Sequence, residues 1–133
     1  MDDLNFLAIA VATVVVLVIS TVYYIAWSKQ LATLSPAYAD VEANARPPAW
    51  KISVELIRSL VLAAVVAKLS QLLDVVDWTG ALQLGLALWV GFPIVLWTGA
   101  VMWERVHPRL AAIHAGDWLL KILVIVVIVV LWR

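Results

Sequence analysis

The sequence predicts an all-α membrane protein, built as a bundle of four transmembrane helices with short loops. Of the 133 residues, 65% are hydrophobic and only 14% are charged, and the mean hydropathy is +1.04. A water-soluble domain typically carries about a quarter charged residues, so this chain has too few charges to cover a soluble surface. Four apolar blocks follow one another, each near the roughly 20 residues that a helix needs to cross hydrocarbon. We expect one domain, residues 1–133.

The first two predicted helices cover residues 4–27 and 50–73. The first block contains no charged residue, and it lacks the positive n-region and the small-residue cleavage site of a secretory signal peptide. We therefore expect it to remain in the protein as a transmembrane helix. The second block is apolar but holds three charged residues, which are considered below. In the loop between the two blocks we expect a short interfacial helix around residues 38–45.

The third and fourth predicted helices cover residues 78–103 and 111–132. Only glycines and Pro93 interrupt the third block, and Asp77 is a suitable N-cap because its carboxylate can accept hydrogen bonds from the first free N–H groups. The fourth block finishes in a dense run of valine and isoleucine. In water such a run favours a strand, but a single strand in lipid cannot satisfy its own backbone, so we predict a helix.

Tryptophan falls at the ends of the predicted helices, at Trp27, Trp50, Trp78, Trp103 and Trp132. Indole rings prefer the headgroup layer of a bilayer, which supports these boundaries. Basic residues gather in the loop between the first two helices and in the loop between the last two. The positive-inside rule therefore places both long loops in the cytoplasm and both termini outside.

Several short motifs of the chain are characteristic. They are Tyr23-Tyr24 before Trp27, Leu88-Trp89-Val90-Gly91-Phe92-Pro93, Trp103-Glu104-Arg105, Ala115-Gly116-Asp117-Trp118 and Leu131-Trp132. With these motifs the chain resembles a family of small bacterial membrane proteins, the domain-of-unknown-function family number seventeen sixty-one. The resemblance implies four helices in a bacterial inner membrane. The family has no assigned activity, so the resemblance transfers no functional residues.

Charged residues inside the predicted helices are the main candidates for a functional site. A central Asp, Lys or Arg costs about 2.5–3.5 kcal/mol in a membrane helix, so such residues normally pair or line a cavity. Glu55 and Arg58 are three residues apart, which places them on one helical face. Asp117 and Lys121 are four apart with the acid first, which is the favourable order. Both helices start on the same side of the membrane, so the two pairs are predicted to meet as a four-charge cluster with His114 at its cytoplasmic mouth.

The predicted cluster has two interpretations. In the functional interpretation it is a polar intramembrane site, either a proton relay or a binding site for a small polar or charged ligand. In the structural interpretation each pair neutralises itself within its own helix and only fixes how the second and fourth helices pack. Polar contacts between membrane helices average about 0.6 kcal/mol, so they specify packing more than they stabilise it.

The third predicted helix contains a proline and a small-residue step. Pro93 removes the hydrogen bond to the carbonyl of Trp89, which predicts a kink. Ala87 and Gly91, four residues apart, allow another helix to approach closely. We expect tight packing here, within the bundle or between protomers. A hinge for alternating access is the alternative.

Known catalytic and metal-binding patterns are missing from the sequence. It has no Ser/His/Asp arrangement, no HExxH motif and no phosphate-binding loop, so we expect no enzyme and no catalytic residues. Glu104 with His107, and His114 with Asp117, place an acid and an imidazole three residues apart, but a bundle metal site needs further carboxylates from facing helices. We therefore expect no metal and no cofactor. The chain has no cysteine, and its net charge of zero gives no basic footprint for nucleic acid.

Three classes of function remain at this point. The first is a small transporter or channel that binds or moves a polar solute or a proton through the site between the second and fourth helices, as a homo-oligomer and preferably a dimer. The alternative is an accessory or structural subunit that binds another membrane protein or lipid. A membrane-embedded enzyme ranks last. If the chain is a transporter, the four charges should face one cavity. If it is a subunit, the charges should form closed ion pairs, and the Gly/Ala face of the third helix should be exposed.

Overall fold

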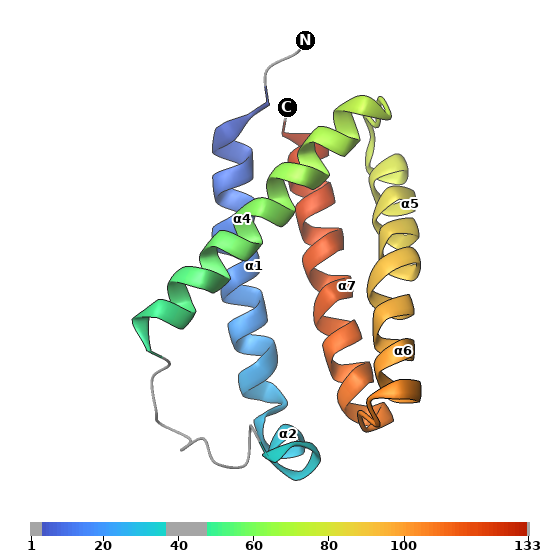
Figure 1. Cartoon of the computed structure of the whole chain (residues 1–133). Coiled ribbons are helices and arrows are strands. Elements are labelled where there is room, and N and C mark those ends of the chain that lie inside the picture. Colours follow the sequence, from blue (N-terminus) through green and yellow to red (C-terminus); the bar gives the residue numbers. More distant parts are fainter. Residues whose placement is uncertain (1–3, 37–47, 133) are drawn as a thin grey trace.

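A computed structural model describes residues 4–36 and 48–132, and all regular secondary structure in these two ranges is helical (Figure 1). The elements are α1 (Phe6–Ala26), α2 (Ser28–Leu34), α4 (Ala49–Leu72), α5 (Trp78–Trp89), the π-helical turn η1 (Val90–Ile94), α6 (Val95–Trp103) and α7 (Pro108–Leu131). The all-α prediction is confirmed for this part of the chain. The interfacial helix expected around residues 38–45 lies outside the described residues.

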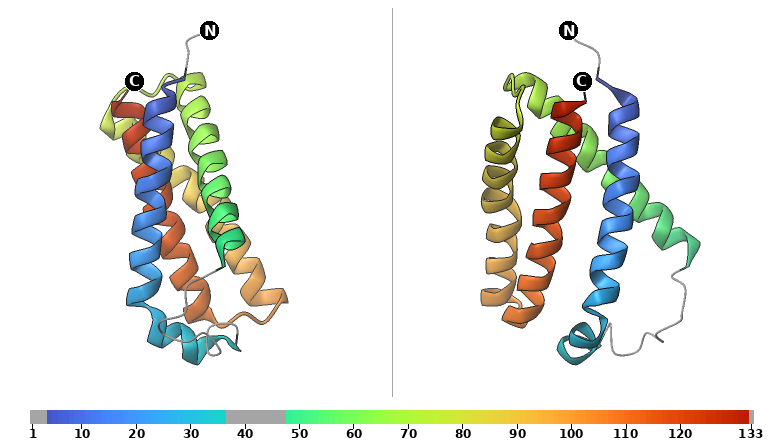
Figure 2. Two further views of the ribbon diagram at one scale, coloured as in Figure 1. Left: turned by 90° about the vertical axis from the view of Figure 1, so that its left-hand side faces the viewer. Right: turned by 180° about the vertical axis from the view of Figure 1, so that it is seen from behind.

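Three long helical rods form one layer, and α4 crosses one face of it obliquely (Figures 1 and 2). The central rod is α7, which packs against α1 on one side and against α5 and α6 on the other. Because α4 contacts both α1 and α7, the hydrophobic core lies where these three helices meet. Its most buried members include Val16 of α1, Ala63 of α4 and Ile125 of α7.

Three of the described helices are long and apolar enough to cross a membrane: α1, the continuous rod from Trp78 to Trp103, and α7. The helix α4 also has 24 residues, but Lys51, Glu55, Arg58 and Lys68 make it too polar to join this set. The structure is therefore that of a membrane-compatible helical protein, and length and composition identify α1, the α5–η1–α6 rod and α7 as its candidate spans.

The rod from Trp78 to Trp103 passes Pro93 without breaking. Proline has no N–H and its ring clashes with the preceding turn. Around Pro93 the helix widens into the π-helical turn η1, so α6 continues from α5 as one rod. At the start of the rod Asp77 is the N-cap, and its Oδ1 accepts a hydrogen bond from the Gly80 N–H at 2.8 Å.

The helix α4 ends in a Schellman motif whose left-handed position is held by a residue other than glycine. Asp74 has a φ of +54°, its N–H donates to the Gln71 carbonyl at 3.1 Å, and the Val75 N–H donates to the Ser70 carbonyl at 2.9 Å. This left-handed position usually holds glycine, because a Cβ clashes there. We expect the Asp74→Gly variant to be about 1 kcal/mol more stable than Asp74→Ala. Thermal unfolding in detergent micelles measures the difference, and equal stability of the two variants would contradict it.

Candidate functional site

A buried ion pair lies near the middle of α7. The Lys121 Nζ is 2.9 Å from the Asp117 Oδ2, and the two side chains are only 10% and 2% exposed. Lys121 comes thirteen residues after Pro108, which puts it about 20 Å along a helix of 24 residues. In a helix that crosses a membrane, a lysine at this position cannot easily reach the headgroup layer, so the aspartate beside it is its natural partner.

Ser20 of α1 completes this pair. Its Oγ donates a hydrogen bond of 2.6 Å to the Asp117 Oδ1, so each carboxylate oxygen of Asp117 has a partner. The Lys121 ammonium also lies 5.0 Å from the centre of the Trp118 ring, within the range of a cation–π contact. No buried side-chain nitrogen or oxygen in the described ranges lacks a hydrogen-bond partner. The group is therefore electrically neutral and internally satisfied.

One turn earlier on α7, His114 is held between two other helices. Its Nδ1 shares a hydrogen bond of 2.7 Å with the Tyr24 hydroxyl of α1. The Trp97 ring of α6 stacks on the imidazole, with ring centres 4.6 Å apart and an angle of 13° between the planes. His114 thus joins α1 to α6 through α7.

Backbone carbonyls of the same turn of α7 accept side-chain donors from both neighbours. The Tyr23 hydroxyl of α1 donates to the Ile113 carbonyl at 2.7 Å, and the Trp89 indole N–H of α5 donates to the Ala115 carbonyl at 2.8 Å. Gly116 makes the first contact possible, because a Cβ at that position would collide with the Tyr23 hydroxyl.

We call this whole group the α7 belt. It consists of Ser20, Tyr23, Tyr24, Trp89, Trp97, residues 113–118 and Lys121. The belt fastens both neighbouring rods to one segment of α7. It also contains motifs that carry the family resemblance, Tyr23-Tyr24 and Ala115-Gly116-Asp117-Trp118.

The four-charge cluster predicted between the second and fourth helices is not formed. Glu55 and Arg58 make an ion pair with each other, and their side chains are 42% and 55% exposed. In the described ranges no ion pair connects them to Asp117 or Lys121. The reason is the tilt of α4, whose N-terminal half diverges from α7 (Figure 1). The partner of Asp117 comes instead from Ser20 of α1.

The other predicted positions are distributed as follows. Pro93 is buried, whereas Ala87 and Gly91 are exposed on the α5–η1 surface, and a Cβ added to Gly91 would meet no atom within 4 Å. The small-residue step is thus not packed against any other described part of the chain. His107 is the N-cap of α7, where its Nδ1 accepts from the Arg109 N–H at 3.1 Å. Among the described residues no three metal-binding side chains gather together.

Sequence reasoning missed Ser20 and the cross-helix donors Tyr23 and Trp89. A signal for Ser20 exists, because a buried carboxylate needs donors and Ser20 is one of few polar residues in the first apolar block. When the first and fourth predicted helices run antiparallel, Ser20 also lies at about the same level along the bundle as Asp117. The indole and phenol donors have no comparable signal, since their acceptors are backbone carbonyls.

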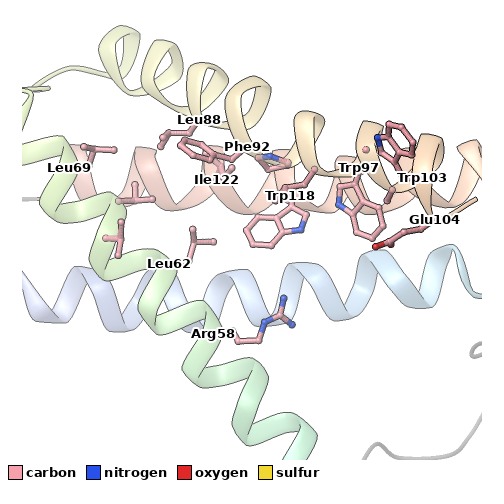
Figure 3. A pocket seen from close by; sticks show the side chains of 16 residues that line it. Arg58, Leu62, Leu69, Leu88, Phe92, Trp97, Trp103, Glu104, Trp118 and Ile122 are labelled. Atoms are coloured by element: carbon pink, nitrogen blue, oxygen red, sulfur yellow. The ribbon is translucent and has the colours of Figure 1, made fainter. Parts of the chain in front are cut away.

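A groove lies on the face of the layer that α4 crosses. It has a volume of about 760 Å³ and is bounded by α4 on one side and by the η1–α6 segment on the other, with Trp118 and Ile122 of α7 between them (Figure 3). Its lining is mainly apolar, and its charged members are Arg58 and Glu104. We call it the α4–α6 groove.

The family model described as "Protein of unknown function (DUF1761)" matches residues 7–130, nearly the whole chain. No curated protein and no solved structure matches the chain. The matched range includes every residue of the α7 belt and the charged members of the α4–α6 groove.

Proposed function

The chain belongs to the DUF1761 family of proteins of unknown function, and from that premise we propose that it is a non-enzymatic membrane protein that binds another membrane component. The component is a lipid or another membrane protein, including a second copy of the chain. The family has no assigned activity, so the proposal rests on the geometry.

The observation that carries this proposal is the closed pairing of the charges. A transport site for a polar solute would hold its charged groups around one shared cavity, ready to exchange partners. Here Asp117 is bound by Lys121 and Ser20, while Glu55 and Arg58 are paired on the outside of α4. The buried group joins α7 to α1, and the Glu55–Arg58 pair lies apart from it on the surface. This arrangement favours binding at the surface of the bundle over passage through a shared internal cavity.

We further propose that α4 crosses the membrane, which gives four crossings. Both α1 and the α5–α6 rod begin at the end of the bundle where α7 finishes, and there the Asn5 Nδ2 donates to the Trp132 carbonyl at 2.9 Å (Figure 1). If both rods cross in the same direction, the chain has to return between them. The helix α4 is about 36 Å long and connects the two ends.

The cellular location and the oligomeric state are part of the same proposal. Basic residues in the α1–α4 and α6–α7 connections support a cytoplasmic location of both connections in a bacterial cell, with both termini outside. The exposed Ala87–Gly91 step supports close approach of a partner helix, either from a second copy in a dimer or from another membrane protein.

Proton or solute transport is a second candidate, and one observation favours it. The Asp117–Lys121 pair and the Tyr24–His114 hydrogen bond lie one helical turn apart. Intramembrane ionisable residues in such a series are typical of proton relays. This candidate requires water to reach the pair in at least one conformation.

Accessibility of Ser20 distinguishes the two candidates. The chain has no cysteine, and Ser20→Cys is a nearly isosteric reporter beside Asp117. In native membranes, a small charged thiol reagent should label the exposed control Lys51→Cys fully. It should label Ser20→Cys no faster than the cysteine-free chain, from either side. Labelling of Ser20→Cys above that background would overturn the binding proposal and favour transport.

A further inference from the structure

We propose that the α4–α6 groove binds one zwitterionic phospholipid of the surrounding bilayer. Its phosphate would bind Arg58, its primary ammonium group would bind Glu104, and its acyl chains would lie along the apolar part of the groove. This inference rests on the proposed function, because it names a lipid as the component that is bound.

The shape and lining of the groove fit an amphiphile. Its volume of about 760 Å³ lies within the range of small-molecule binding sites, which is about 300–1,000 Å³. Leu69 and Leu88 lie at one end and Glu104 lies at the other, as Figure 3 shows. One end therefore suits hydrocarbon and the other suits a headgroup. Glu104 caps the end of α6, where an interfacial group belongs.

Two charged residues of the groove select the headgroup. Glu104 lies at the polar end, and Arg58 lies on α4 nearer the middle of the groove (Figure 3). Arg58 donates one of its five N–H groups to Glu55, which leaves others for a phosphate. Glu104 is in no ion pair within the described residues and offers its carboxylate to an ammonium group. Trp97 and Trp103 line the same end, and their rings attract cations. A headgroup with both charges fits these residues, whereas an anionic headgroup would be repelled by Glu104 and by Glu55.

The bilayer is the source of this ligand because of where the groove lies. It runs between the membrane-compatible α5–α6 rod and α4, on a face that no other described element covers. Acyl chains are the molecules that such an apolar surface meets in a membrane. The groove also reaches Trp118, whose ring contacts Lys121, so a bound lipid would lie directly outside the α7 belt.

Two glycines of the same rod provide a matched pair of variants. Gly99 lines the groove and Gly91 does not, and a Cβ at either position meets no atom within 4 Å. Gly99→Leu therefore begins its side chain in open space at the groove, and Gly91→Leu adds the same side chain elsewhere. Thermal midpoints of the two variants verify that both are folded. Arg58→Gln, with Lys51→Gln as its control, tests the proposed phosphate contact without filling the groove.

Native mass spectrometry of the purified full chain measures binding, with phosphatidylethanolamine and phosphatidylglycerol of identical acyl chains as probes. We expect one bound phosphatidylethanolamine, held about tenfold more tightly than phosphatidylglycerol. Gly99→Leu, Arg58→Gln and Glu104→Gln should each weaken this binding about tenfold, because each removes packing or a charged hydrogen bond. Gly91→Leu and Lys51→Gln should bind as the unaltered protein does.

Three outcomes would overturn the inference. They are equal affinity for the two lipids, equal binding by Gly99→Leu and Gly91→Leu, and loss of a dimer in Gly99→Leu with lipid binding unchanged. The last would assign the groove to a second copy of the chain. If lipid binding fails while Ser20→Cys stays unlabelled, the general binding proposal stands and only this ligand is wrong.

Discussion

Replacing Lys121 with methionine is expected to destabilise the folded protein by about 3–5 kcal/mol, because it leaves the Asp117 carboxylate buried without its counter-charge. Methionine has nearly the length of lysine, so little packing is lost. The Ser20 hydrogen bond remains in this variant, but a single neutral donor does not replace an ammonium group 2.9 Å away. Equilibrium unfolding in mixed micelles measures the loss.

The double variant Asp117→Asn, Lys121→Met is expected to recover most of that stability, to within about 1–2 kcal/mol of the unaltered protein. Replacing both members of a buried pair is often close to neutral, since the cost of burying the charges disappears with them. Lys51→Met, at an exposed position of α4, serves as the control for losing a lysine. A double variant as unstable as Lys121→Met alone would show that the pair does more than balance charge.

Gly116→Ala is expected to cost about 1–3 kcal/mol, which is typical of forcing an extra methyl group into a packed site. The added Cβ would collide with the Tyr23 hydroxyl. Relieving the clash would break the Tyr23 hydrogen bond to the Ile113 carbonyl or push α1 away from α7. Loss of thermal stability in detergent, compared with the unaltered chain, measures this cost.

The second substitution Tyr23→Phe separates the steric clash of Gly116→Ala from other effects of the added alanine. In a Tyr23→Phe background the nearest atom to the new Cβ is the ring Cζ at 3.4 Å, an ordinary contact. Gly116→Ala should therefore cost much less in that background. Gly91→Ala meets no atom and should stabilise by about 0.5–1 kcal/mol through helix propensity. An undiminished cost in the Tyr23→Phe chain would contradict the proposed contact.

Local features of this chain are predictable from its sequence because they depend on neighbouring residues. Asp77 caps α5 as its side-chain chemistry predicts, and the Asp117–Lys121 pair follows from their spacing on one helix. The same local reasoning predicts a kink at Pro93, and the structure has a π-helical turn at this position.

The partners of the candidate site could not be predicted in the same way. Whether Glu55 and Arg58 meet Asp117 depends on the tilt of α4, and tilt is set by how side chains of two helices interlock over many residues. Composition and periodicity contain no such information. The hydrogen bonds of Tyr23 and Trp89 end on carbonyls, which every residue has, so nothing in the sequence marks Ile113 or Ala115 as acceptors.

If α4 crosses the membrane as proposed, it reaches the bilayer before one of the two helices that it packs against. Among the described elements α1 and the short α2 come before α4, while α7 follows it. A segment with four charges is a poor substrate for insertion alone, because each central charge costs about 2.5–3.5 kcal/mol on the insertion scale. Entry of α4 as a hairpin with α1 would lower that cost. The contacts between α4 and α7 would then form only after α7 is made, so α7 would be the described helix that completes the core.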